Sequence, residues 1–378
     1  MSILWKIIPA HIYITAIVLS WGLTASLQSC ATSFTSLVCL RVLLGIGEAA
    51  FAGIPFYLSF FFKRTELAFR LGLFISSAPL ATAFASSLAW LIVRIGESSP
   101  IASWRLLFLL EGFPSVIVAV VAFTIIPDSP SKAKYLTRRE RRIAQTRLQK
   151  TASATSATRL DWRDILGIVV DPKCLIIACM FFSTNLAFAS LPAFLPTIIR
   201  DMGHSNLISQ ALAAPPYLFA FAVVVYTAWL SDRLQSRAVF IAFHALLSAS
   251  GYLLLALSEY FALGNWWRYA AVYPAAVGFF SVVAITITWN INNQDNVSKQ
   301  GAAFAFMQLV GQCGPLIGTR LYPDIEAPYY TKGMGVCGCA MVLAASLAIG
   351  LRMYLSRKNA ALARDASSYS TEKFFYIL

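Results

Sequence analysis

Residues 268–291 read RYAAVYPAAVGFFSVVAITITWNI, and this stretch decides the class of fold. After Arg268 no charged side chain follows until Asp295. A helix needs about 20 predominantly apolar residues to cross the hydrocarbon core of a bilayer, so this segment is long enough to span it. A soluble helix of this length would need a polar face, and none is present here.

The rest of the chain repeats the same pattern. Of its 378 residues 58% are hydrophobic and only 12% are charged, whereas soluble domains carry about 25% charged residues. A chain this apolar cannot cover a water-facing surface, so we predict an all-α integral membrane protein. Ten stretches qualify as spans: 9–30, 34–62, 69–93, 105–127, 174–198, 209–230, 238–258, 268–291, 302–320 and 333–355.

Basic residues are distributed unequally between alternate loops. The largest group, eight Lys and Arg side chains between 132 and 150, falls on the same side as the basic loops near 63–70, 233–237 and 352–358. The positive-inside rule therefore places these loops and both chain ends in the cytosol. This topology also explains the net charge of +13 without nucleic acid, because no basic globular stretch with interleaved aromatics is present.

One long polar segment divides the chain. We expect an incomplete N-terminal half of four spans at 1–127, a cytosolic linker at 128–171, a six-helix half at 172–358 and a cytosolic tail at 359–378. In the linker Thr137 and Glu140 have the spacing of a helix-capping box. The tail is polar up to its apolar last five residues, 374–378, which we expect to be unstructured.

Two charges interrupt the second span. Arg41 and Glu48 are seven residues apart, which puts them on nearly the same helix face but about 10.5 Å apart along the axis, too far for a direct ion pair. Each group therefore needs a partner on another helix, in water or in a ligand. Either they line a polar cavity, with Arg41 for an anion and Glu48 as a proton-titrating group, or both are structural hydrogen-bonding groups.

Three other polar groups break the apolar pattern. Asn185 interrupts the fifth span, and Asn290 and Asn293 lie at the end of the eighth, where cavity lining competes with interhelical packing or with helix capping. Asp232, Arg233 and Arg237 fill a very short cytosolic turn and can clamp two helix ends, or serve only as topology charge. Glycines 311, 314 and 318 with Pro315 predict close packing and a bend in the ninth span.

Motifs of enzymes are missing from the sequence. It contains no phosphate-binding glycine loop, no Gly-x-Ser-x-Gly elbow and no HExxH, and its three histidines are widely spread. The seven cysteines are an odd number within or beside apolar runs, so disulfides and zinc are not expected. We therefore expect neither an enzyme nor a bound metal or cofactor.

Several motifs in order along the chain resemble one family. They are R-x3-G-x2-E-A at 41–49, W-R-x2-F-x2-E-G at 104–112, P-D-S-P at 127–130 and D-R-x3-R at 232–237. The chain resembles the major facilitator superfamily, its anion:cation symporters, and most narrowly the fungal allantoate permease branch. Members of that branch carry allantoate, nicotinate, pantothenate, biotin and similar anions. Matched by motif, the ten spans look like helices three to twelve of a twelve-helix bundle, with helices one and two lacking.

The resemblance implies a secondary active transporter that works by alternating access, carrying a small organic anion with a proton. It implies attraction of the substrate anion by Arg41 and proton coupling by Glu48. From the residues we expect substrate binding also by Asn185, Asn290 and Asn293, and conformational gating by Asp232, Arg233 and Arg237. We also expect a monomer in the plasma membrane, without nucleic acid. The alternative is a truncated, non-transporting membrane protein or pseudo-transporter.

Overall fold

The computed structural model describes residues 8–51, 53–63, 65–96, 101–152, 167–295, 297–366 and 374–378. Every regular element in these ranges is a helix. This is the outcome that lipid imposes, because a helix satisfies its own backbone hydrogen bonds where no water can. The predicted all-α membrane fold is therefore confirmed.

Eight of the described helices are long and apolar enough to cross a membrane. They begin and end within a few residues of the predicted spans, except that the last continues well beyond its predicted end. They are α2 (Ala10–Gln28), α5 (Leu67–Gly96), α6 (Ser103–Ile125), α9 (Pro172–Asp201), α10 (Asn206–Leu234), α11 (Ala238–Ala256), α12 (Asn265–Asn292) and α15 (Thr331–Ala366).

The other two predicted spans are not continuous helices. The stretch 34–62 folds as α3 (Phe34–Phe51) and α4 (Ile54–Ser59), and 302–320 folds as α13 (Val297–Gly311) and α14 (Cys313–Gly318). The second break falls at Gln312, within the stretch where the glycines and Pro315 predict a bend. A Cβ on Gly314 would lie 2.6 Å from the Phe182 carbonyl oxygen of α9, so only glycine permits this approach.

The chain divides into two compact units: residues 1–63 with 88–154, and residues 64–87 with 155–378. Most of α5, residues 67–87, thus groups with the C-terminal helices, although the sequence assigns it to the N-terminal half 1–127. The start of α5 is hydrogen-bonded to the end of α10, as described below. The functional division at the linker remains a prediction.

In the first unit α2 packs against α6 and α3. Its closest approach to α6 depends on two glycines. A Cβ on Gly112 would lie 2.5 Å from the backbone nitrogen of Ser26, and one on Gly22 would lie 2.9 Å from that of Val116. Small residues are the usual means of bringing membrane helices together, because lipid provides no hydrophobic drive for their association.

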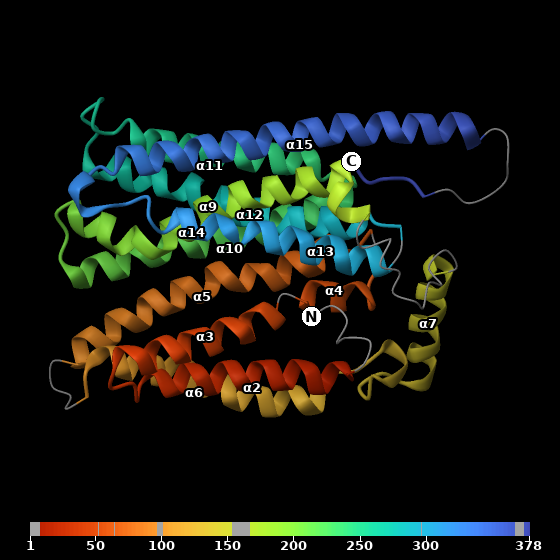
Figure 1. Cartoon of the computed structure of the whole chain (residues 1–378), viewed down its shortest axis with the longest axis horizontal. Helices are drawn as coiled ribbons and strands as arrows, with labels where there is room; N and C mark the ends of the chain where they lie inside the picture. The colour runs from red at the N-terminus through yellow and green to blue at the C-terminus, as the bar shows by residue number, and fades with distance from the viewer. Residues whose placement is uncertain are drawn as a thin grey trace. The chain divides into compact units, whose positions relative to one another are not determined.

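The second unit is built around α12, in which every residue from Ala275 to Asn292 is buried. Helices α9, α10 and α11 pack on α12. Helix α15 packs on α9 and α11, and both α13 and α14 pack on α9. Figure 1 shows these helices running alongside one another. With 36 residues α15 is about 54 Å long, more than the ~30 Å hydrocarbon core, so part of it projects from the bilayer.

The linker carries two further elements, and another 3-10 turn, η2 (Asp324–Glu326), lies between α14 and α15. A short 3-10 turn, η1 (Pro130–Lys132), precedes α7 (Arg138–Ala152). The predicted capping box is confirmed: the backbone nitrogen of Thr137 donates to Glu140 Oε2 at 2.7 Å, and that of Glu140 donates to Thr137 Oγ1 at 3.3 Å. The expectation of an unstructured tip was wrong, because Phe374–Leu378 is hydrogen-bonded to the second unit.

Candidate functional site

The two charges of the second span lie on α3 in the first unit. Both Arg41 and Glu48 are exposed, and within the described residues neither forms an ion pair. The Arg41 guanidinium carbon lies 5.3 Å from the ring centroid of Phe108 on α6. Charged groups at membrane depth face water-filled cavities rather than lipid, because lipid cannot solvate them. The structure therefore leaves both groups available to water or to a ligand.

In the second unit two buried amides face the same helix. Asn290 Nδ2 on α12 lies 3.5 Å from Met307 Sδ of α13, and a Cβ on Gly311 of α13 would lie 3.2 Å from Asn185 Nδ2 of α9. Met307 and Gly311 are four residues apart, so the two amides meet one face of α13, one turn apart. The structure brings Asn185 and Asn290 to the broken α13–α14 path.

Both amides retain unsatisfied polar atoms. Among the described residues Asn185 Nδ2 and Asn290 Oδ1 have no hydrogen-bond partner, and the same holds for Gln308 Oε1 on α13. A buried polar group without a partner costs about 1–3 kcal/mol, so water or a ligand is needed here. A free donor and free acceptors can bind an amide, a hydroxyl or a carboxyl group.

The third predicted amide has a different environment. Asn293 follows the last residue of α12, and its side chain forms two hydrogen bonds with the backbone of Ile377, at 2.8 and 3.0 Å. Asn293 therefore holds the C-terminal peptide in this structure. Its role in substrate binding stays a prediction.

The short turn after α10 forms a clamp. Asp232 Oδ1 is ion-paired with Arg237 Nη2, and Asp232 Oδ2 accepts from the backbone nitrogen of Phe69, at the start of α5, at 2.6 Å. Arg237 precedes α11 and its side chain is completely buried, whereas that of Asp232 is 11% exposed. One carboxylate thus joins the ends of α5, α10 and α11.

Arg233 lies outside this clamp. Its guanidinium carbon lies 5.4 Å from the ring centroid of Trp229, one turn earlier on α10, and the side chain is exposed. Together with Thr65, Glu66 and Phe69 it lines an open cavity of about 450 Å³ beside Asp232. The sequence suggested two guanidiniums for the clamp, and the structure uses one.

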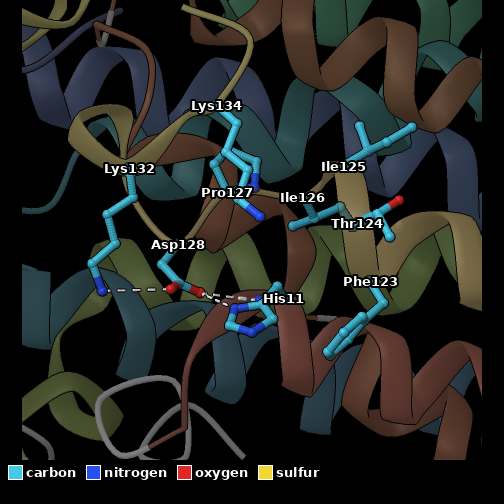
Figure 2. Close-up of a pocket in the computed structure, with 9 residues that line it drawn as sticks. All are labelled: His11, Phe123, Thr124, Ile125, Ile126, Pro127, Asp128, Lys132 and Lys134. Atoms are coloured by element: carbon cyan, nitrogen blue, oxygen red, sulfur yellow. Dashed lines mark hydrogen bonds and ion pairs between the residues drawn. The ribbon is translucent and has the colours of Figure 1, made fainter.

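A second polar cluster, which the sequence did not predict, joins the linker to α2. Asp128 Oδ1 lies 2.7 Å from His11 Nδ1 and 3.2 Å from the His11 backbone nitrogen, and Lys132 Nζ lies 3.5 Å from Asp128 Oδ2. Figure 2 shows His11 and Lys132 converging on this carboxylate, beside a cavity of about 310 Å³. The sequence gives no signal for this contact, because its two partners are 117 residues apart along the chain.

The electrostatics of this cluster favour the ionised acid. Partial burial tends to raise the pKa of Asp128, but the two hydrogen bonds from His11 and the nearby charges outweigh it, so the pKa lies below its ordinary value. The carboxylate also caps the first turn of α2, where a negative charge is favoured by the helix dipole. The cluster has the properties of a structural tie between linker and helix.

Comparison with known proteins identifies the family. The model of the Major Facilitator Superfamily matches residues 6–319. The chain is 28% identical over 376 residues to the MFS transporter prlL of Fungal sp. (strain NRRL 50135), covering 99% of this chain and 75% of the relative. It is 30% identical over 347 residues to the major facilitator-type transporter hxnP of Emericella nidulans, covering 91% and 70%.

Among solved structures, the proton:xylose symporter XylE bound to 6-bromo-6-deoxy-D-glucose matches with a TM-score of 0.70. The identity is 14%, and the match covers 92% of this chain and 79% of that one. The relatives are named as transporters, in agreement with the prediction that the chain is not an enzyme. This chain belongs to the Major Facilitator Superfamily and is a multi-pass integral membrane transporter of that type.

Proposed function

We propose that this chain is a secondary active carrier that moves a small organic anion together with a proton by alternating access. The observation that carries the proposal is the pair of exposed charges, Arg41 and Glu48, on nearly one face of α3. Placing a charge at membrane depth costs at least about 2.5–3.5 kcal/mol, so such groups are retained mainly where they bind or transfer something.

Arg41 is the group that attracts the anion. Stacking over Phe108 holds one face of the guanidinium and leaves the N–H groups at its edge free to bind a carboxylate through two parallel hydrogen bonds. Lysine could supply the charge at this position but not that planar geometry.

Glu48 is the group that takes the proton. Protonation removes its charge, which makes the side chain easier to bury during the step in which the site changes access. The offset of about 10.5 Å from Arg41 leaves room for a small ligand between the two groups. Proton coupling is compatible with this fold, since the structurally similar XylE is named a proton:xylose symporter.

In the second unit, Asn185 and Asn290 are the proposed substrate-binding amides. Asn185 and Asn290 offer an unpartnered donor and acceptor among the described residues, and they border a helix break. Broken helices are a common way for transporters to expose polar backbone near the substrate. Asn293 would contribute only after its two bonds to Ile377 have opened.

The clamp would act as the gate. Asp232 and Arg237 join three helix ends, so breaking their ion pair would free the start of α5 from α10 and α11. Arg233 would contribute only charge beside the open cavity. We further propose a monomer in the plasma membrane. Both termini and the linker are proposed to lie in the cytosol, and the loop-charge asymmetry supports this orientation.

Uptake into proteoliposomes under an imposed pH gradient tests the proposal. The panel contains labelled mono- and dicarboxylates, including nicotinate and pantothenate. Arg41→Gln should weaken anion uptake by about ten-fold or more, and Arg41→Lys should recover only part of it, because a charged hydrogen-bonding pair contributes about 1.5–3 kcal/mol. Glu48→Gln mimics the protonated acid and should abolish proton-driven accumulation while retaining exchange of labelled for unlabelled substrate.

Two exposed loop residues serve as matched controls. Arg320→Gln and Glu259→Gln remove the same charges away from α3 and should transport like the parent. Accumulation at the parental level in both α3 variants would make Arg41 and Glu48 structural and refute the assignment. Failure of the parent with every substrate would favour the non-transporting alternative.

A further inference from the structure

The last five residues, Phe374–Leu378, are held by side-chain amides in a regular way. Asn293 Oδ1 accepts from the Ile377 backbone nitrogen at 2.8 Å while its Nδ2 donates to the Ile377 carbonyl oxygen at 3.0 Å. Asn359 on α15 repeats this arrangement on Tyr376, with both hydrogen bonds at 2.9 Å. Two successive residues are thus bound through both of their backbone polar groups.

Trp289 adds a third anchor to the same peptide. Its Nε1 donates to the Ile377 carbonyl oxygen at 2.8 Å, and its side chain is completely buried on α12. Asn293 is also completely buried. With the peptide in place the indole N–H and both amide atoms are buried and hydrogen-bonded, which is how folded proteins satisfy buried polar groups.

The same peptide also meets the start of α11. The backbone nitrogen of Arg237, directly before that helix, donates to the Leu378 carbonyl oxygen. This contact adds a third helix to the two that hold the peptide through Asn293 and Asn359.

A lysine on a fourth helix completes the site. Lys173 on α9 lies with Nζ 5.2 Å from the ring centroid of Tyr376, and the same Nζ donates to the Asn293 carbonyl oxygen at 3.0 Å. The side chain of Lys173 is only 8% exposed. Figure 1 shows the C-terminus lying against this bundle.

We propose that Trp289, Asn293, Asn359 and the start of α11 form a peptide-binding site, and that its ligand is the chain's own segment 376–378. When the peptide is bound, the site joins the starts of α9 and α11 to the end of α12 and the last turns of α15. The clamp and the basic loops lie beside these helix ends. Arg237 takes part in both structures: its backbone binds the peptide and its side chain binds Asp232. The peptide is therefore a latch that stabilises the engaged clamp.

Hydrogen exchange followed by mass spectrometry on the purified full chain tests the latch without any substrate. The amides of Tyr376 and Ile377 should exchange at least about ten-fold more slowly than in a free peptide of the same sequence. Asn293→Ala removes both bonds to Ile377 and should abolish most of this protection. Asn206→Ala, at the exposed first residue of α10, is the matched control and should leave it unchanged.

Asn359→Ala removes both bonds to Tyr376 and should likewise lose protection at residues 376–378 and at the Arg237 amide. Exchange of Tyr376 and Ile377 in the parent at the rate of the free peptide would overturn the proposal. Full protection in both Asn293→Ala and Asn359→Ala would do the same. Neither result depends on the proposed anion or proton.

Discussion

The Asp232–Arg237 ion pair provides the sharpest test of the structure. Arg237 is completely buried, and its partners are Asp232 and the Ser231 hydroxyl, which lies 2.8 Å from Nη1. Asp232→Ala leaves this guanidinium buried without a counter-charge, which typically costs about 3–5 kcal/mol. The variant also removes the acceptor of the Phe69 N–H at the start of α5. We therefore expect the upper part of that range.

A second substitution in the same chain distinguishes a buried ion pair from general disruption. Arg237→Met replaces the guanidinium by an apolar side chain of similar length, and the Ser231 hydroxyl keeps its bond to the Ser236 carbonyl oxygen at 2.7 Å. Replacing both members of a buried pair by apolar groups is often close to neutral. The double variant should recover at least about 2 kcal/mol of the loss caused by Asp232→Ala alone.

Equilibrium unfolding in mixed detergent micelles, followed by tryptophan fluorescence, measures these differences. Arg233→Ala is the matched control, because Arg233 is exposed and loses only its stacking on Trp229, worth about 0.5–1 kcal/mol. If Asp232→Ala costs less than Arg233→Ala, or if the double variant is no more stable than Asp232→Ala, the clamp does not hold these helix ends.

Three further predictions follow from other parts of the chain. Gly112→Ala should lower the stability measured in thermal melts by about 1–3 kcal/mol, because the new Cβ would lie 2.5 Å from the Ser26 backbone nitrogen. Gly45→Ala is the control and should be neutral or stabilising, because a Cβ there would have nothing within 4 Å. Equal effects of the two variants would disprove the α2–α6 contact. The pKa of Asp128 is lowered in the folded state, so its contribution is present above the ordinary aspartate range and is lost as pH falls through the lowered pKa. Melting curves between about pH 6 and pH 2.5 should show this acid-dependent loss in the parent and not in Asp128→Asn, whereas parallel curves would contradict it. A cysteine in place of Ser153 should react with an impermeant maleimide only after the cells are permeabilised, and labelling of intact cells would reverse the topology.

Much of the architecture could be predicted from local sequence. Lipid leaves a chain little choice of secondary structure. The length of the apolar stretches alone therefore placed eight spans, and most of their ends lie within a few residues of the prediction. The capping box of Thr137 and Glu140 is equally local, since its partners are three residues apart. The bend at Gly311–Pro315 could be predicted because glycine and proline have few roles inside a membrane helix.

The candidate site could be predicted only in part. Arg41 and Glu48 stood out because charge is rare in a span, yet the stacking of Arg41 on Phe108 joins residues 67 positions apart and has no sequence signal. The same holds for the meeting of Asn185 and Asn290 on α13. Asn293 shows the limit most clearly, because an amide after a helix can cap, line a cavity or bind a peptide, and only its neighbours select among these.

The sequence by itself determined the class of protein, the place of its eight long continuous helices and the identity of the residues that are costly in lipid. These properties depend on composition and spacing, which act through local helix formation and transfer from water to lipid. The tertiary structure alone decided which guanidinium pairs with Asp232, that His11 meets Asp128, and that Ile377 is bound by Asn293. The last two contacts join residues 117 and 84 positions apart. The energies of all three depend on distance and burial, which only the packed helices define.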